Sequence, residues 1–516
     1  MKNMKKYIQY LAVSLVVGST ITACTKSFLT VTPVGTNLEA NYYQNQAQAF
    51  AGLVSVYDVV GWQGGGFVTK ENAMDAASDD HVAGGGSATD ISDLQMISNY
   101  TLTPAAGPQA ELWKAGYSGV FRANVLLGKL PNVPMDAALK ARYIAETKGL
   151  RAYFYFDLVR LFKNIPLITS PLPADQIYDI EQVAPAVIYT QIEKDLTEAI
   201  AEPSLPNTVA IATDGGRWTK GTMHALLGKV YLYEQKWTQA AAEFNQVNGT
   251  PGVANPTYGY KLLPNFGDLF KLANKYNSES ILEVAHSSQS NGNWGCIACT
   301  EGNVLNIITG PRSYTPTASA PDYISGYGFL PITADLFNAI HFDPRNKPTV
   351  ANLDSLKAKG LCTYDPSYQN TGFFLEKYMG RVSTRSTGSG NFELNFPQNL
   401  YEIRLADTYL MEAEALIRGS GDLVRAAALM TAVHSRAYND NVSHPLPATL
   451  AALKLERRLE LAGEGHRWFD LVRWGDALTA LALKGFIAGK HEILPVPLND
   501  LTSTKLKQSK EWGGTL

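Results

Sequence analysis

The chain has 516 residues and a formal net charge of −3; charged residues make up only 18% of it, while tyrosines number 26 and glycines 43. Such a mildly acidic chain has no basic surface of the kind that nucleic-acid binding requires. The length allows two or three ordinary domains, or one large helical fold with insertions.

The amino terminus has the layout of a secretory signal peptide. Three lysines, at positions 2, 5 and 6, precede an apolar run centred on Leu11–Val17 that is too short for a comfortable transmembrane span. Ile21–Cys24 then ends in a cysteine directly after small residues, which resembles the lipobox of bacterial lipoproteins. We therefore expect a lipoprotein signal peptide over 1–23, a lipid on Cys24 and a lipidated tether over 24–40. The alternative is a plain secreted protein with an incidental cysteine.

Helical periodicity dominates both ends of the remaining chain. Leu227-Gly228-x-x-Tyr231, followed by Ala240 and Phe244, has the spacing of a tetratricopeptide helix pair. In such a pair small residues let two antiparallel helices approach closely, and large residues fill the groove between them. Similar two-helix units are predicted at 112–130 with 137–162, at 185–201 with 217–246, and at 401–418 with 422–438.

Two stretches lack this periodicity. Residues 61–104, with glycine runs at 64–66 and 84–86, and residues 251–400 are rich in Gly, Pro, Asn and Ser between short apolar runs such as Ser280–Ala285. This pattern predicts loops, short strands and a few brief helices. Loops on a rigid helical scaffold are the usual place for binding residues.

Three cysteines remain after Cys24. Cys296-Ile-Ala-Cys299 has half of a zinc-site spacing, but a closed tetrahedral site needs four ligands and the sequence has no second pair. We therefore expect no metal. In an oxidising exterior we expect one local loop disulfide that involves Cys296 or Cys299, with an odd thiol left over from the set that includes Cys362. The sequence leaves the pairing open.

Charges and aromatics alternate most densely over 455–475. Leu455, Leu459 and Ala462 recur on one helix face, opposite charges stand three to four residues apart, and Gly463 and Gly465 interrupt the helix. We interpret this segment as a structural ion network rather than a catalytic site. The reason is that neighbouring arginines lower carboxylate pKa values and so keep those groups ionised.

The segment 455–475 resembles the C-terminal signature of the SusD/RagB family of outer-membrane nutrient-binding lipoproteins. Four further blocks match that family in the expected order, so that the resemblance covers essentially the whole mature chain. These blocks are Ser78–Asp80, Leu150–Phe162 with Asn164–Leu167, Arg404–Leu416 and Glu492–Pro497.

The resemblance implies a mostly α, SusD-like fold, in which tetratricopeptide-like helix pairs form a right-handed superhelical scaffold with a loop-rich, mixed α/β insertion. It implies an N-terminal helical region over 41–250 that contains the insertion at 61–104, a ligand-binding insertion over 251–400, and a C-terminal helical region over 401–516. It also implies a lipid-anchored protein of the outer membrane that faces the cell exterior. Such a protein passes an oligosaccharide or polysaccharide to a SusC-type TonB-dependent transporter.

Two of the tryptophans are candidates for contact with a ligand. Trp62 and Trp294 lie in Gly- or Asn-rich loops with no apolar periodicity to bury them, and an exposed indole ring suits stacking on the apolar face of a sugar. The alternative is that each ring is buried and anchors its loop. His81 is a candidate for hydrogen bonds to sugar hydroxyls. Further aromatic candidates are Phe67, Tyr314, Tyr323 and Tyr327.

The sequence lacks local enzyme signatures. His491-Glu492 does not continue into a metalloprotease motif, and there is no Gly-x-Ser-x-Gly elbow. We therefore expect a binding protein that has no catalytic residues and needs no cofactor. Three alternatives stay open: a peptide-binding RagB-like member, because Tyr and Trp serve both ligand classes; a glycoside hydrolase, because paired carboxylates need only meet in space; and a purely scaffolding repeat protein.

Overall fold

The computed structural model describes residues 42–289, 292–296 and 300–516, and the folded body spans Asn45–Leu516. The predicted signal peptide, Cys24 and the tether over 24–40 lie outside the described residues. Within the part of the chain that is described, no helix combines the length and the apolar character that crossing a membrane requires.

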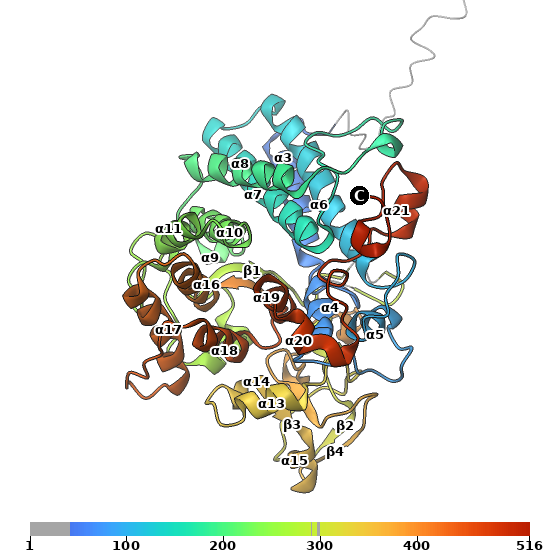
Figure 1. Ribbon diagram of the computed structural model, residues 1–516, viewed down its shortest axis with the longest axis vertical. Helices are drawn as coiled ribbons and strands as arrows, with labels where there is room; N and C mark the ends of the chain where they lie inside the picture. Colours follow the sequence, from blue (N-terminus) through green and yellow to red (C-terminus); the bar gives the residue numbers. More distant parts are fainter. Residues whose placement is uncertain (1–41, 290–291, 297–299) are drawn as a thin grey trace, which may run out of the picture. The chain divides into compact units, whose positions relative to one another are not determined.

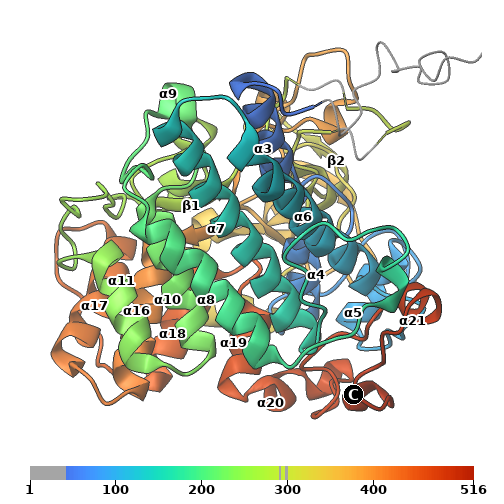
Figure 2. The same cartoon turned by 90° about the horizontal axis from the view of Figure 1, so that it is seen from above.

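A row of packed helices forms the larger part of the body. Neighbours in the row contact one another in the order α3, α6, α7, α8, α10, α11, α16, α17, and Figure 2 shows most of them side by side. Their bounds are α3 Gln46–Gly61, α6 Gln109–Lys129, α7 Ala137–Phe162, α8 Pro185–Ala201, α10 Lys220–Tyr233, α11 Trp237–Asn248, α16 Leu405–Arg418 and α17 Leu423–Tyr438.

The tetratricopeptide-like contact predicted between α10 and α11 is confirmed. A Cβ atom on Gly228 would lie 2.8 Å from the ring of Phe244, so the two helices approach as closely as a glycine permits. Phe244 and Ala240 are fully buried, and they pack on Met411 and Ala415 of α16. The small residues thus let the rings fill the groove, as the spacing indicates.

One predicted helix boundary is wrong. The helix expected to begin at residue 401 begins at Leu405, and Leu400–Arg404 forms the strand β6 instead. This strand pairs antiparallel with β1, Ser280–Val284. Backbone pairing with a distant segment therefore overrides the helical pattern at this point, which local periodicity cannot reveal.

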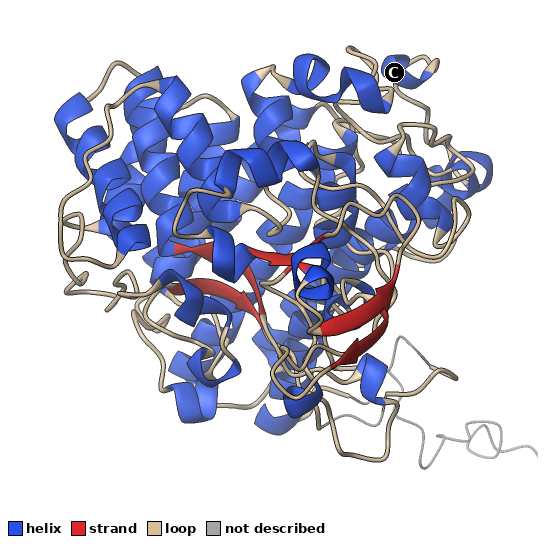
Figure 3. Cartoon of the chain, turned by 90° about the horizontal axis from the view of Figure 1, so that it is seen from below, coloured by secondary structure: helices blue, strands red, loops and turns tan. Residues whose placement is uncertain are grey.

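The two loop-rich stretches contain short elements, as the sequence predicts. Figure 3 shows the strands as short pieces separated by loops, and they form three two-stranded antiparallel ribbons. Besides β1 with β6, these are β2 Arg312–Pro316 with β4 Cys362–Asp365 and β3 Val350–Asn352 with β5 Phe373–Leu375. The short helices of these stretches are α4 Lys70–Ala77, α5 Ser92–Ser98, α12 Leu305–Ile308, α13 Ala334–Ile340, α14 Asn346–Thr349 and α15 Leu353–Ala358, and α9 Ile211–Asp214 precedes α10.

The C-terminal helices carry the segment 455–475 into the interior (Figure 1). Gly463 and Gly465, both with φ of +71°, separate two of these helices, as predicted. Left-handed backbone of this kind favours glycine. The helices are α18 Leu450–Leu461, α19 Arg467–Trp474, α20 Ala477–Leu481 and α21 Leu498–Ser503.

The predicted ion network is present and buried. Glu460, which is fully buried, accepts hydrogen bonds from Arg404 at 2.6 Å, from Arg345 at 3.0 Å and from Arg436. Burial alone would raise the pKa of Glu460, but the three guanidinium groups outweigh it and hold that pKa far below its ordinary value. The carboxylate is therefore ionised at neutral pH, which confirms the structural interpretation of this segment.

The network also fixes the N-terminal insertion to the C-terminal helices. Arg467 binds Asp79 with two hydrogen bonds of 2.8 Å, and Arg458 binds Asp80 at 2.7 Å. Gly465 donates its N–H to Asp75 of α4 at 3.1 Å. These contacts hold α4, and with it the loop that precedes α4, against a rigid part of the fold.

Candidate functional site

Three of the aromatic residues predicted from the sequence lie together. The rings of Phe67 and Trp294 are nearly parallel, with an interplanar angle of 6° and centroids 5.9 Å apart. The ring of Tyr327 lies 6.4 Å from that of Phe67 at an angle of 39°. Trp294 is 44% exposed, and the other two rings are half-buried. We call Phe67, Trp294 and Tyr327 the aromatic platform.

The loop of Trp294 is held by a tight turn and by a second loop. Asn293 accepts the N–H of Cys296 at 3.0 Å on its carbonyl and the N–H of Gly295 at 2.9 Å on its side chain. From the second loop, Asn391 donates its N–H to the carbonyl of Gly292 at 3.0 Å. The backbone around the indole ring is therefore fixed on both sides.

The described cysteines are Cys296 and Cys362. Cys296 is disulfide-bonded, which confirms the predicted loop disulfide, and Cys362 is the odd thiol, free and buried. Cys299 lies outside the described residues. Among the described residues, no three His, Cys, Asp or Glu side chains gather as a metal site would require.

Phe67 and Tyr327 are positioned by backbone contacts. Asn72 of α4 donates its side-chain amide to the carbonyl of Phe67 at 3.0 Å, and Thr69 caps the N-terminus of the same helix. Tyr327 donates its N–H to Ile307 at 3.0 Å, and its carbonyl accepts a hydrogen bond from Arg312 at 3.1 Å. Three segments that are far apart in the sequence thus meet at the platform.

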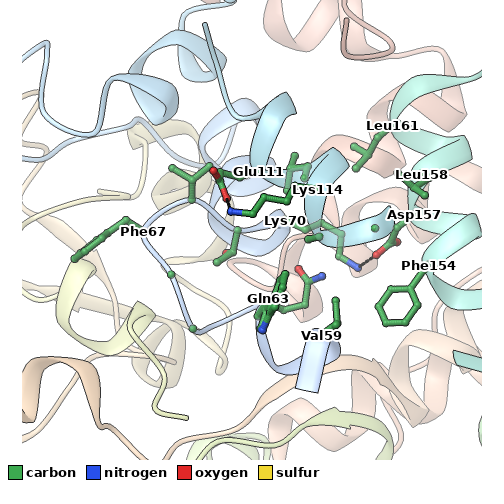
Figure 4. A pocket seen from close by; sticks show the side chains of 18 of the residues that line it. Val59, Gln63, Phe67, Lys70, Glu111, Lys114, Phe154, Asp157, Leu158 and Leu161 are labelled. Carbon is green, nitrogen blue, oxygen red and sulfur yellow. Dashed lines mark hydrogen bonds and ion pairs between the residues drawn. The ribbon is translucent and has the colours of Figure 1, made fainter. Parts of the chain in front are cut away.

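A pocket of about 450 Å³ lies beside the loop that carries Phe67, and Phe67 is one of its lining residues. Figure 4 shows Phe67 at the outer end of this loop, directed away from Phe154, Leu158 and Leu161 of α7. The pocket is lined by these α7 side chains, by α6, and by the loop residues from Trp62 to Thr69. We call it the side pocket; Phe67 borders both this pocket and the platform.

Trp62 belongs to the side pocket rather than to the platform. Its ring is half-buried, and the guanidinium of Arg122 lies 5.3 Å from its centroid. A cation over one ring face leaves at most the other face for a ligand.

Charges at the floor of the side pocket are satisfied by the protein. Lys70 donates to Asp157 at 2.7 Å, to Glu402 at 2.8 Å and to Tyr153 at 3.0 Å, which uses all three of its N–H groups. Burial would lower the pKa of Lys70, but the charges of Asp157 and Glu402 outweigh it and raise that pKa. The ammonium group is thus charged and fully paired, so it is a structural group.

Three other candidates lie in the core. His81 is fully buried, its Nδ1 contacts the carbonyl of Leu330 at 3.0 Å, and burial lowers its pKa to about 4. Tyr314 and Tyr323 are 6% and 5% exposed and belong to one hydrophobic cluster. Tyr314 donates its hydroxyl to Pro321 at 2.8 Å, and Tyr323 donates to Glu376 at 2.5 Å. All three side chains are buried here and have partners within the protein, which favours a packing role over the expected ligand contact.

Gln63, Glu111 and Lys114 line the side pocket and were missed by sequence reasoning. Gln63 lies between Trp62 and the first glycine run, so that glycine run could have marked Gln63 as a candidate. Glu111 and Lys114 form an exposed ion pair of 3.4 Å on α6. Nothing in the sequence distinguishes that pair from any other solvent-facing pair on a helix.

Comparison with known proteins identifies the family. The profile of the SusD family matches residues 351–509, and a profile described as starch-binding associating with outer membrane matches residues 40–232. A SusD-like protein of Formosa agariphila is 24% identical in a match that covers 79% of this chain and 81% of the relative.

Solved structures agree over a larger share of the chain. A laminarin-binding SusD-like protein is 50% identical, with a TM-score of 0.86, and the match covers 90% of this chain and 99% of that one. Surface glycan-binding protein A from Bacteroides thetaiotaomicron, solved in complex with laminarihexaose, is 26% identical with a TM-score of 0.78, and the match covers 89% and 98% of the two chains. This chain therefore belongs to the SusD family.

Proposed function

We propose that the protein binds an oligosaccharide or polysaccharide on the aromatic platform. The observation that carries this proposal is the parallel arrangement of Phe67 and Trp294, with Trp294 44% exposed. Sugar rings have apolar C–H faces that stack on aromatic rings, and a few polar groups beside the rings fix their orientation. The platform offers the exposed ring of Trp294, and the side-chain amides of Asn293 and Asn391 lie on the two loops that hold this ring.

Similarity to glycan-binding proteins supports the same ligand class. The solved neighbour that is 50% identical to this chain binds laminarin, and the neighbour that is 26% identical was solved with laminarihexaose. Laminarin and laminarihexaose are therefore the first ligands to test.

The variant Trp294→Ala is expected to weaken binding of laminarihexaose about 10- to 100-fold, because it removes the most exposed ring of the platform. Isothermal titration calorimetry of residues 25–516 measures this change. Phe342→Ala is the matched control, since Phe342 is an aromatic residue that is 91% exposed and takes no part in the platform. Equal affinities of the wild type and Trp294→Ala would remove the platform from the binding site, and binding of peptides alone would favour the RagB-like alternative.

We further propose that a lipid on Cys24 anchors the protein to the outer membrane, facing the exterior. The order of lysines, apolar run and cysteine supports this, and the matching family description places relatives in association with the outer membrane. Cys24→Ala is expected to move the protein from the membrane fraction to the soluble fraction, which immunoblotting of the two fractions measures. Continued membrane association of this variant would contradict the anchor.

Delivery of the glycan to a SusC-type TonB-dependent transporter completes the proposal. Membership of the SusD family supports this partner. Detergent pull-down from the native host tests it, and recovery of no such transporter would contradict the delivery step.

We also propose that the protein does no covalent chemistry on its ligand. The two solved neighbours are named for binding rather than for catalysis, which supports this proposal. Incubation with laminarin followed by a reducing-end assay tests it, since new reducing ends would reveal a glycoside hydrolase.

A further inference from the structure

The side pocket has polar groups that the protein leaves unsatisfied. The backbone N–H groups of Gly65, Gly66, Phe67 and Val68 donate to no other described residue. The side chain of Gln63 also lines the pocket (Figure 4), and its Oε1, which is shielded from solvent in this structure, lacks a partner among the described residues. An unpaired polar group in a pocket is a place where a ligand hydroxyl gains a hydrogen bond.

The opposite wall of the side pocket is mainly apolar, with the ion pair of Glu111 and Lys114 as its charged part. It is formed by side chains of α6 and α7, among them Leu112, Leu158 and Leu161. A sugar ring has the matching chemistry, because its C–H face suits an apolar wall while its hydroxyls suit free amides and a carboxamide. The volume of about 450 Å³ is within the range of about 300–1,000 Å³ that is typical of small-ligand sites.

Two of the residues that line the pocket, Gly65 and Gly66, directly precede Phe67, and no packing contact inside the protein requires a glycine at either position. A Cβ atom on Gly65 would meet its nearest neighbour at 3.5 Å, and one on Gly66 would meet its nearest neighbour at 3.9 Å, both ordinary contact distances. Neither residue has a positive φ. Gly64 differs, because its Cβ would lie 2.5 Å from His286. Packing explains Gly64, whereas the absence of side chains at 65 and 66 leaves a low rim that another molecule can approach closely.

We propose that the side pocket takes a single sugar ring that projects from a glycan held on the aromatic platform and passes over Gly65 and Gly66. The projecting ring is either a side branch or a chain end of this glycan. Both present the same C–H faces and hydroxyl groups to the pocket. This inference rests on the proposed function, because it requires a glycan on the platform. It assigns Gly65, Gly66 and Gln63 as residues that determine which glycans bind tightly.

Three ligands with one backbone test the proposal: linear laminarihexaose, the same hexamer with one single-sugar branch, and a cyclic form without ends or branches. Calorimetry of the wild-type protein is expected to show about tenfold tighter binding of at least one ligand with a projecting ring than of the cyclic form. If the projecting ring is a side branch, only the branched ligand is expected to bind more tightly than the cyclic form. If it is a chain end, the linear and branched ligands are expected to bind more tightly than the cyclic form by equal factors.

Gly66→Leu is expected to abolish this preference and leave binding of the cyclic ligand unchanged, because the leucine blocks only the rim. Gln63→Ala is expected to reduce the preference about fivefold through the loss of one hydrogen bond. Gly128→Leu is the matched control, since Gly128 is exposed on α6 and a Cβ atom there would meet nothing within 4 Å. Thermal melting checks that each variant is folded.

Two results would overturn the inference while the proposed function stands. One is equal wild-type affinity for all three ligands, and the other is an equal loss of affinity for all three in Gly66→Leu. In both cases Trp294→Ala still weakens binding of every ligand. Failure of the wild-type protein to bind any of the three would instead count against the proposed function, and the inference would fall with it.

Discussion

Replacing Glu460 with alanine is expected to lower the free energy of unfolding by about 3–5 kcal/mol, which is typical for removal of one partner from a buried ion pair. Glu460 is fully buried and accepts hydrogen bonds from Arg345, Arg404 and Arg436. The substitution removes a negative charge from beside three buried guanidinium groups, and water cannot reach them to replace it. The cost comes mainly from those uncompensated cations rather than from the lost contacts themselves.

Urea unfolding followed by circular dichroism measures this loss. The control is Asp179→Ala, which removes an ion pair with Lys505 in which both side chains are about 60% exposed. Because water screens that pair, the control is expected to change the free energy of unfolding far less than Glu460→Ala does. Similar losses in the two variants would show that the buried cations are compensated by other groups.

The helical scaffold was largely predictable because its signals are local. The spacing around Gly228 and Phe244 predicts a close helix pair, and the two glycines at 463 and 465 predict the break between α18 and α19. The partners of Glu460 were not predictable, because its three arginines lie in segments more than 20 residues away along the chain. The sequence therefore indicated that an ion network exists but not which charges meet.

The candidate site was predictable only as a set of loop aromatics. Phe67, Trp294 and Tyr327 meet in space, whereas Tyr314 and Tyr323, from equally loop-like sequence, are buried in a cluster. The local composition around the platform residues resembles that around Tyr314 and Tyr323, so composition does not distinguish the two groups. The difference lies in the tertiary packing of their loops. The unpaired amides beside Gly65 and Gly66 had no sequence signal except the glycines, because backbone hydrogen bonding is set by tertiary contacts.

Asp75→Asn is expected to stabilise the protein relative to the wild type, by an amount that grows with pH. Asp75 is 1% exposed, its Oδ1 accepts the N–H of Gly465 at 3.1 Å, and its Oδ2 has no partner among the described residues. Burial, aided by the charge of Asp80 and opposed by the hydrogen bond from Gly465, raises the pKa of Asp75 to about 8. The carboxyl group is therefore protonated in the folded protein at neutral pH.

The sign of the pH effect follows from this raised pKa. Between its ordinary value of about 4 and about 8, the unfolded chain has an ionised Asp75 while the folded protein retains the proton. The unfolded state thus binds fewer protons, and this residue lowers stability by about 1.4 kcal/mol for each unit that the pH rises. Asparagine does not titrate and keeps the oxygen that accepts the N–H of Gly465, so it removes this loss.

Urea unfolding of both proteins at several pH values measures the effect. The stability of Asp75→Asn minus that of the wild type is expected to increase by about 3 kcal/mol between about pH 5 and about pH 7.5. The difference is the informative quantity, because His81, whose pKa burial lowers to about 4, makes stability rise over part of the same range in both proteins. A difference that does not change with pH would show that Asp75 is ionised in the folded protein.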